Sequence, residues 1–243
     1  MPKSKYLKIY QVIKQRIETF EYDFQQLLPS ENEFAEEFSC SRNTVRRALS
    51  TLASDGYVQS IRGKGVRVIF EPQNKQHFII GSIESFTEAA KRNHLDIVTK
   101  VILFSELTVD ERIRRRTGFE VGKEIYYIQR VRYINGKPLI TDHNYFLKDI
   151  VTNLTQEIAQ YSIYEYLENV LNVSIVTTKR IFTVEQIIEK DEQYMELNGC
   201  NCVAVVSNST YNADGVMFEF TQSRHSPMYF EFHDVATRNR PTG

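Results

Sequence analysis

Two short basic stretches near the amino terminus carry side chains suited to contact with nucleic acid. Residues 41–47 read Ser-Arg-Asn-Thr-Val-Arg-Arg, and residues 62–65 read Arg-Gly-Lys-Gly. The planar guanidinium of arginine can hold guanine O6 and N7 together, and serine and threonine hydroxyls suit phosphate oxygens. Two glycines beside two cations allow a tight turn that can approach a phosphate backbone. The first stretch therefore predicts base reading, and the second predicts a contact at the edge of a groove.

Helix caps place the first stretch on the second of two short helices. Ser30 and Glu33 have the spacing of a capping box and open a helix with apolar residues within 34–38. Ser41 can cap a second helix, on which Arg42 and Arg46 are four residues apart and share a face. The opposite face of that helix is apolar, with Val45, Ala48, Leu49 and Leu52 at helical spacing.

A basic β-hairpin is expected after these helices. Residues 57–61 and 66–69 alternate like strands, and the Arg-Gly-Lys-Gly turn lies between them. Helix, turn, helix and basic hairpin predict a winged helix-turn-helix, which places its second helix in a DNA major groove. Arginines on one helix face are also common on solvated surfaces. Six basic residues against one acidic residue between positions 41 and 67, in a chain of net charge −1, favour DNA as the partner.

This region resembles the amino-terminal domain of the GntR family of bacterial transcription regulators. The resemblance is carried by LPSENEFAEEF, SRNTVRRAL, the DGY at 55–57 and IRGKG. It implies a first helix over Leu7–Phe20 and a winged helix-turn-helix over residues 1–70 that contacts double-stranded operator DNA. The predicted DNA-binding residues are Ser30, Ser41, Arg42, Asn43, Thr44, Arg46, Arg47, Arg62, Gly63 and Lys64.

Further along the chain, three sets of polar residues could bind a ligand. Arg130 and Arg132 are two apart on a predicted strand and share a face, where two cations repel unless they share an anion or are solvated. Ser162 and Glu165 have capping-box spacing, which offers either a phosphate seat or a plain helix cap. A late strand carrying Glu219 and residues 223–225, together with Asp142, could bind sugar hydroxyls or be structural.

Seven alternating segments downstream predict strands, at 98–104, 125–134, 139–145, 175–184, 203–211, 216–223 and 230–235. Asn135-Gly136 predicts a hairpin turn between two of them. Helices are expected at 85–92, 110–117, 162–171 and 190–197. Hairpins with interspersed helices predict an α+β domain on a mostly antiparallel sheet over residues 81–243, after a linker at 71–80.

This second region resembles the UTRA effector domain of the HutC branch of GntR regulators, whose fold is similar to chorismate lyase. The matching pieces are Ser85-Phe86-Thr87, Arg130-Val131-Arg132, Ser162-Ile163-Tyr164 and the strand from Glu219 to Arg224. The resemblance implies phosphate contacts from Arg130, Arg132, Ser162, Tyr164 and Ser85, and sugar contacts from Asp142 and Glu219. Phe86, Thr87 and Arg224 complete the predicted effector-binding residues.

The segments at 144–158, 162–168 and 220–225 are most similar to the trehalose-operon repressors of Gram-positive bacteria. This implies a homodimeric repressor that is released from its operator by a sugar phosphate, trehalose 6-phosphate. The alternatives are a regulator of the same architecture that senses another effector, such as glucosamine 6-phosphate, and an enzyme with a lyase-like fold. We expect no enzymatic activity, since no nucleophile–base pattern or glycine-rich phosphate loop is present.

Composition sets limits on the other classes of protein. Of the 243 residues 42% are hydrophobic, yet no apolar run approaches the ~18–20 residues that span a bilayer, and the first residues do not resemble a signal peptide. We therefore expect a cytoplasmic protein without membrane contact. Cys200 and Cys202 could suggest a pair of metal ligands, but no histidine or further cysteine lies near them in the sequence. With Cys40, they therefore predict reduced thiols, no metal and no cofactor.

Overall fold

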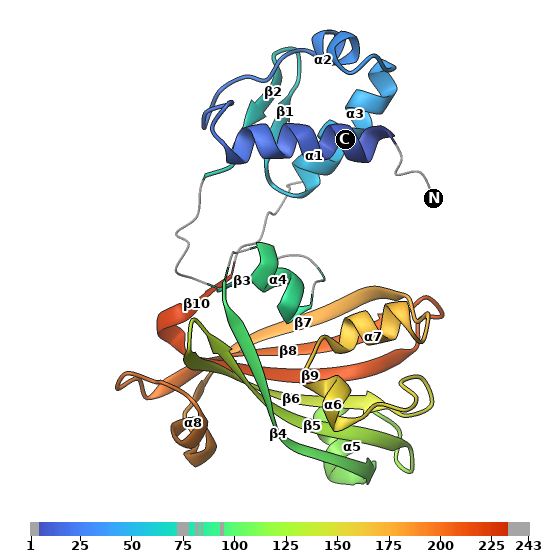
Figure 1. Ribbon diagram of the computed structural model, residues 1–243, viewed down its shortest axis with the longest axis vertical. Helices are drawn as coiled ribbons and strands as arrows, with labels where there is room; N and C mark the ends of the chain where they lie inside the picture. Colours follow the sequence, from blue (N-terminus) through green and yellow to red (C-terminus); the bar gives the residue numbers. More distant parts are fainter. Residues whose placement is uncertain (1–4, 72–77, 81–82, 84, 93–94, 233–243) are drawn as a thin grey trace, which may run out of the picture. The chain divides into compact units, whose positions relative to one another are not determined.

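The computed structural model describes residues 5–71, 78–80, 83, 85–92 and 95–232 (Figure 1). Its contacts divide into two compact units, one holding the first hairpin and the helices before it, the other everything from β3 (Phe78–Ile80) to β10 (Phe230–Phe232). Within the predicted linker, residues 72–77 lie outside the described residues, while 78–80 form a strand. No helix in these ranges is long and apolar enough to cross a membrane.

The first unit is a winged helix-turn-helix. It consists of α1 (Lys5–Glu18), α2 (Glu31–Glu37), α3 (Arg42–Ser54) and the antiparallel hairpin β1 (Val58–Ile61) and β2 (Gly65–Val68). The first helix begins and ends two residues earlier than expected, and Phe20 beyond it has a positive φ of 60°. The capping box at Ser30 and the Ser41 cap are present, with each hydroxyl accepting from the backbone N–H three residues on.

One apolar core holds this unit together. The side chains of Ile13, Phe34, Val45, Leu52 and Val68 are fully buried, and they come from α1, α2, α3 and β2. Burial of an aliphatic or aromatic side chain of this size contributes about 1.5–3 kcal/mol. The helix that carries the arginines and the basic hairpin are therefore fixed to one another by the same core.

The second unit is built on a six-stranded antiparallel sheet, as expected. The strands run in the order β4, β5, β6, β9, β8, β7. Their bounds are β4 Ile97–Thr108, β5 Glu124–Ile134, β6 Lys137–Leu147, β7 Ile175–Gln186, β8 Cys202–Asn212 and β9 Met217–His225. The Asn135-Gly136 turn joins β5 and β6, with positive φ at both residues.

The last predicted strand lies outside this sheet. After β9, Ser226 and the 3-10 turn Pro227–Tyr229 break the chain, because proline cannot continue a strand ladder. β10 then pairs in parallel with β3, with Phe230 opposite Phe78. Of the predicted range 230–235, residues 233–235 lie outside the described part of the chain.

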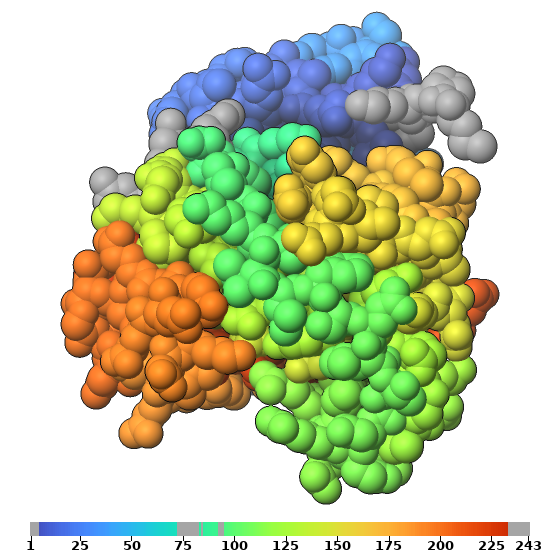
Figure 2. Space-filling model, turned by 60° about the horizontal axis from the view of Figure 1, so that its bottom comes forward, coloured from blue at the N-terminus to red at the C-terminus, as the bar shows by residue number. Residues whose placement is uncertain are grey.

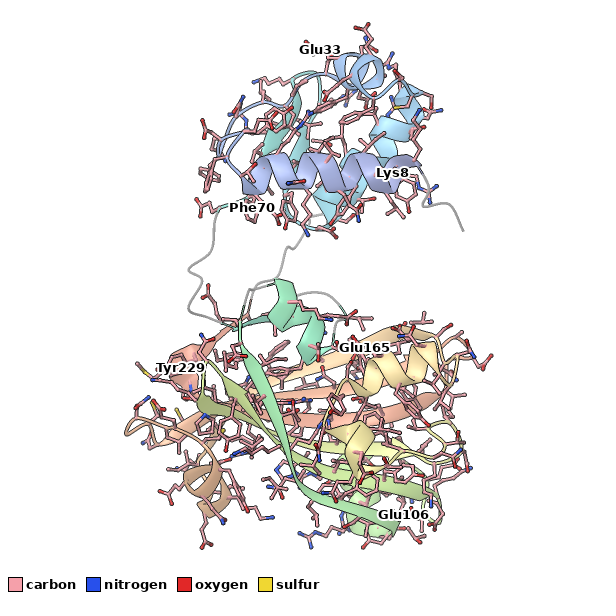
Figure 3. All side chains as sticks on the ribbon, viewed as in Figure 1. Lys8, Glu33, Phe70, Glu106, Glu165 and Tyr229 are labelled. Atoms are coloured by element: carbon pink, nitrogen blue, oxygen red, sulfur yellow. The ribbon has the colours of Figure 1, made fainter. Side chains whose placement is uncertain are left out.

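Helices cover both faces of the sheet (Figures 1 and 3). One face carries α4 (Phe86–Arg92), α6 (Gln156–Ala159) and α7 (Ile163–Asn169), and the other carries α5 (Glu111–Thr117) and α8 (Glu189–Tyr194). The short helix α6 was not expected from the sequence. Figure 2 shows the segments around α5 and α8 as two separate projections of the second unit. The face under α4 and α7 holds the polar side chains described below.

Candidate DNA-binding surface and effector pocket

The amino-terminal end of α3 presents a compact polar surface. The Ser41 hydroxyl accepts a hydrogen bond from the Thr44 amide (3.3 Å) and lies 2.9 Å from the Thr44 hydroxyl. Arg42 and Arg46 extend from the same face of the helix, with 60% and 59% of their side chains exposed. Asn43 is also exposed. These are the positions from which a recognition helix reaches base edges.

An acidic residue that sequence reasoning missed holds these arginines. Glu31, at the first turn of α2, accepts two hydrogen bonds from Arg46 (Nε 3.0 Å, Nη2 2.8 Å) and a longer one from Arg42 (3.5 Å). The hydrogen bond from Arg46 lowers the pKa of Glu31, so this carboxylate stays charged near neutral pH. A bidentate pair fixes the plane of a guanidinium. Glu31 thus orients Arg46 before any DNA is present.

Arg47 and the hairpin complete the surface. The Arg47 guanidinium lies 3.9 Å from the centre of the Tyr6 ring on α1, which is a cation–π contact. Arg62, Gly63 and Lys64 form the exposed turn between β1 and β2. Gly63 has a φ of 73°, a conformation that residues with a Cβ rarely adopt.

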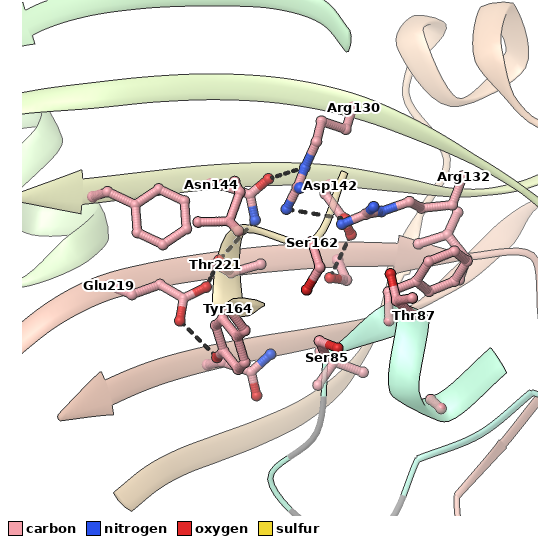
Figure 4. A pocket seen from close by; sticks show the side chains of 18 of the residues that line it. Ser85, Thr87, Arg130, Arg132, Asp142, Asn144, Ser162, Tyr164, Glu219 and Thr221 are labelled. Carbon is pink, nitrogen blue, oxygen red and sulfur yellow. Dashed lines mark hydrogen bonds and ion pairs between the residues drawn. The ribbon is translucent and has the colours of Figure 1, made fainter. Parts of the chain in front are cut away.

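The second unit contains a pocket on the sheet face covered by α4 and α7 (Figure 4). The strand register places its side chains in rows that cross β5, β6 and β9. The first row holds Arg132, Ile140 and His225, and the second holds Arg130, Asp142 and Ser223. In the third row, Asn144 and Thr221 line the pocket beside Ile128 of the apolar core. The pocket is therefore floored by residues that are distant in sequence and adjacent through cross-strand pairing.

Two buried arginines share one carboxylate in this floor. Asp142 Oδ2 lies 2.7 Å from Arg132 Nε and 3.9 Å from Arg130 Nη2, and its Oδ1 accepts from Ser223 at 2.7 Å. Arg130, Arg132 and Asp142 are each only 5–6% exposed. Burial, aided by the neighbouring Arg132, lowers the pKa of Arg130 to about 9, and Asp142 opposes this only in part. Positive charge is in excess at this point, and an anion would relieve it.

A chain of hydrogen bonds leads from Arg130 to the far end of the pocket. Arg130 Nε donates to Asn144 (2.9 Å), Asn144 Nδ2 donates to Thr221 (2.8 Å), and Thr221 donates to Glu219 (2.7 Å). The Tyr164 hydroxyl donates to the other oxygen of Glu219 at 2.7 Å. Burial raises the pKa of Glu219, although the hydrogen bonds from Thr221 and Tyr164 oppose that shift. This end of the pocket is lined by polar groups.

The two covering helices close the pocket with their first residues. Ser85 caps α4 by accepting from the Glu88 amide, and the Phe86 ring centre lies 4.7 Å from the Arg132 guanidinium. Ser162 caps α7 by accepting from the Glu165 amide (3.2 Å), whereas the Glu165 carboxylate lies 3.7 Å from Lys91. Both serine hydroxyls, with Thr87, line the pocket beside the arginines (Figure 4).

Nine of the ten predicted effector-binding residues thus surround one cavity, while Arg224 does not. Arg224 lies on the opposite face of the sheet, where its Nε and Nη2 each lie 2.8 Å from an oxygen of the buried Asp191. The reason is the period of two along a strand, since positions 219 and 224 have opposite parity. Other polar lining residues lie outside that set of ten: Asn144, Tyr161, Arg180, Asn208, Thr221, Ser223 and His225. Of these, Ser223 and His225 belong to the late strand that the sequence offered as a possible sugar-binding segment.

A winged helix-turn-helix with an exposed basic recognition helix, joined to a unit with a polar pocket, defines the class of DNA-binding regulators that carry a small-molecule-binding domain. A family model for bacterial regulatory proteins of the gntR family matches residues 5–68, and a UTRA domain model matches residues 92–231. The chain therefore belongs to the GntR family of transcription regulators, with a UTRA domain as its second unit.

Its relatives are regulators of similar length. The chain is 35% identical over 240 residues to the HTH-type transcriptional regulator TreR of Bacillus subtilis (strain 168), covering 99% of this chain and 100% of TreR. The effector-binding domain of the B. subtilis trehalose repressor is 32% identical, with a TM-score of 0.54, and covers 59% of this chain and 99% of that domain. YydK of B. subtilis has the same fold, with a TM-score of 0.83 at 24% identity, over 97% of this chain and 100% of YydK.

Proposed function

We propose that this protein is a cytoplasmic, homodimeric repressor of a sugar-utilisation operon, and that trehalose 6-phosphate releases it from its operator. One observation carries the proposal: two buried arginines on one sheet face share a single carboxylate, beside a row of polar side chains that ends at Glu219. A phosphate ester carries about −1.5 to −2 charges at pH 7. A sugar phosphate could place its phosphate beside the arginines and its sugar hydroxyls along the polar side chains, and so form hydrogen bonds with both parts of the pocket.

The roles of individual residues follow from their positions. Arg130 and Arg132 supply charge to the phosphate, and Ser85 and Ser162 supply hydroxyl donors beside it. Tyr164, which the family resemblance assigns to the phosphate, donates its hydroxyl proton to Glu219 and belongs with the sugar contacts. Glu219, with Asn144 and Thr221, supplies acceptors and donors for sugar hydroxyls. The relative TreR supports trehalose as the sugar, since its solved domain is that of a trehalose repressor.

A ligand panel followed by DNA binding tests this function. Thermal unfolding of the full chain is measured with trehalose 6-phosphate, glucosamine 6-phosphate, trehalose and inorganic phosphate. A ligand at 100 times its Kd stabilises the folded state by about 2.7 kcal/mol. We expect the largest shift with trehalose 6-phosphate. A largest shift with glucosamine 6-phosphate would support a regulator of the same design with that effector, and no shift with either would refute a sugar-phosphate sensor.

A measurement of operator binding tests whether ligand binding in the pocket affects DNA binding. In a gel-shift assay, the stabilising sugar phosphate should weaken operator binding by about 5–150-fold, the usual range of allosteric coupling. Arg132→Ala should bind operator normally and no longer respond. Arg115→Ala removes an exposed arginine from α5, outside the pocket, and should respond like wild type. A normal response of Arg132→Ala would remove Arg132 from the phosphate site.

A further inference from the structure

The sheet face opposite the pocket carries a groove between a basic and an acidic helix. The helices α5 and α8 stand on this face, and the surface is hollowed between their projections (Figure 2). The sequence of α5, Glu-Arg-Ile-Arg-Arg-Arg-Thr, holds four arginines and one glutamate. The sequence of α8, Glu-Lys-Asp-Glu-Gln-Tyr, holds three acidic residues and one lysine. Two identical copies related by a two-fold axis can pair such helices, because each copy supplies both charges.

The floor of the groove is a polar row that crosses the sheet. Gln129, His143, Gln222 and Ser207 pair in succession across β5, β6, β9 and β8. The buried Nε2 of Gln129 has no hydrogen-bond partner in the described part of the chain, and neither does the Oγ1 of Thr141 in the next row. Buried polar atoms nearly always have a partner. The hydrogen bonding of this floor is therefore incomplete within one chain.

Two arginines of α5 lie beside this floor. Arg116 donates a hydrogen bond to Gln222 at 2.5 Å, and Arg112 lies four residues earlier, on the same side of the helix. Burial raises the pKa of Tyr145, which lies two residues after His143 on β6, and both arginines oppose that rise. Among the described residues, no carboxylate lies within ion-pair distance of either arginine. Both side chains are exposed, so their charge is available to a second molecule.

The helix α8 contributes one cation to the groove and presents its acidic side to solvent. Burial is the main cause that lowers the pKa of His143 to about 4, and Lys190 is one of the nearby cations that add to it. Asp191 is only 1% exposed and belongs to the sheet side of the helix. Glu189 and Glu192 are three residues apart and both are exposed. The free carboxylates of α8 therefore lie on the side of the helix that a second molecule can reach.

We propose that this groove is the contact between two copies of the chain, with the acidic side of α8 from one protomer lying against the arginines of α5 from its partner. This assignment rests on the homodimer of the proposed function and adds the surface that forms it. The two-fold axis repeats each contact, so every charge pair occurs twice. Opposite charges across the contact determine how the two copies align.

Apolar side chains at both ends of the polar row extend the proposed contact. Leu103 on β4 pairs with Gln129, and Ile181 on β7 pairs with Ser207, so both lie in the same row as the floor. These two side chains are 42% and 53% exposed, and Ile188 just before α8 is 47% exposed. Large apolar side chains exposed together are typical of interaction surfaces. Their burial would add a hydrophobic contribution to the charge pairs.

Charge reversal tests this surface through the oligomeric state of the full chain. Sedimentation equilibrium measures the dimer dissociation constant of wild type, of Glu189→Lys with Glu192→Lys, of Arg112→Glu with Arg116→Glu, and of all four changes together. Each double reversal should weaken dimerisation by about 10–100-fold, because like charges then face one another at two symmetry-related places. The four changes together exchange the two signs and should recover most of the lost affinity. Such recovery also shows that the substituted chains fold.

Arg114→Glu and Val184→Glu are the matched controls. Arg114 lies on the other side of α5, 3.5 Å from Glu111, and Val184 is 74% exposed on β7, the outer strand of the sheet. Both variants should dimerise like wild type. If Val184→Glu dissociated the dimer while both double reversals left it intact, the edge of β7 would be the interface and the groove would be refuted.

The remaining outcomes separate this inference from the proposed function. A variant with all four changes that stays as dissociated as either double reversal would refute the pairing of α5 with α8. A wild-type dimer that neither double reversal weakens would refute the groove and leave the homodimer standing. A wild-type chain that is monomeric at micromolar concentration would refute the homodimer of the proposed function, and the groove contact with it.

Discussion

Replacing Asp142 with asparagine should make the protein less stable and yet more responsive to phosphate. The carboxylate of Asp142 is the shared counter-ion of Arg132 and Arg130, at 2.7 and 3.9 Å. Asparagine keeps the shape of the side chain and removes its charge. The free protein would then hold two buried guanidinium groups without a counter-ion, and an incoming phosphate would take the place of the missing carboxylate.

The pKa of Asp142 gives the size of the effect. Burial alone would raise this pKa, but Arg132 and Arg130 outweigh burial and lower it to about 2. The lowered pKa corresponds to about 2–3 kcal/mol, and loss of one member of a buried ion pair costs about 3–5 kcal/mol. We therefore expect about 3 kcal/mol less free energy of unfolding. For a unit of this size that lowers the melting temperature by roughly 6–12 °C.

Phosphate should recover much of this loss. One full charge at 4 Å contributes about 4 kcal/mol at an effective dielectric constant of 20, so at least tenfold tighter binding of inorganic phosphate is expected. At saturating phosphate, tenfold tighter binding adds about 1.4 kcal/mol of stabilisation, or roughly 3–6 °C. The assay is thermal unfolding with and without phosphate at constant ionic strength.

Asp191→Asn is the control for this experiment. Asp191 pairs with the buried Arg224 on the opposite sheet face at 2.8 Å and is only 1% exposed. Its removal should destabilise the unit by a similar amount, and phosphate should stabilise that variant no more than wild type. If Asp142→Asn showed the same phosphate-induced shift as wild type, the assignment of the arginine pair as an anion site would be wrong.

Further changes test the DNA-binding unit and the acid response. Arg46→Ala should weaken operator binding by about 1–3 kcal/mol, while its binding to random DNA changes less. Lys64→Ala should weaken binding to both DNAs equally and reduce by about 1 the slope of log affinity against log salt concentration. Gel shifts at several salt concentrations distinguish the two effects. Leu52→Ala should lower the unfolding free energy of the first unit by about 2–5 kcal/mol in urea, because Leu52 is fully buried, while Leu27→Ala at 43% exposure should cost less than about 0.5 kcal/mol. Asp142 has a depressed pKa in the folded state, so its contribution of about 2–3 kcal/mol is present above pH ~4 and is lost as the pH falls toward 2. Urea unfolding at pH 5 and pH 2.5 should show this loss in wild type and not in Asp142→Asn.

The winged helix was readable from sequence because its signals are local. The caps at Ser30 and Ser41 and the glycine turn at Gly63 each act within a few residues. Glu31 was missed because its bonds to Arg46 depend on how α2 and α3 cross, which no local pattern specifies. A salt bridge across a helix pair requires the tertiary structure.

The pocket residues also fall into two groups, those that a local sequence pattern predicts and those that only the tertiary structure identifies. That Arg130 and Arg132 share a face follows from the period of a strand, and the same rule applied to Glu219 and Arg224 would have removed Arg224 from the predicted site. Asn144 and Thr221 could not be predicted from the sequence, because only the register of β6 against β5 and β9 brings them close to the arginines. Register depends on pairings up to about 90 residues apart in the chain, and it is fixed by packing of the whole sheet.

The position of the pocket suggests how binding could reach the DNA-binding unit. Phe86, at the start of α4, lies against Arg132, and α4 packs against β3. On the other side, His225 packs against Phe230, the first residue of β10, which pairs with β3. Both contacts therefore connect the pocket to β3, the strand that follows residues 72–77 in the chain.

A ligand can change operator affinity only if it binds two states of this region with different free energies. The coupling is reciprocal, so if a sugar phosphate weakens operator binding by some factor, operator DNA must weaken sugar-phosphate binding by the same factor.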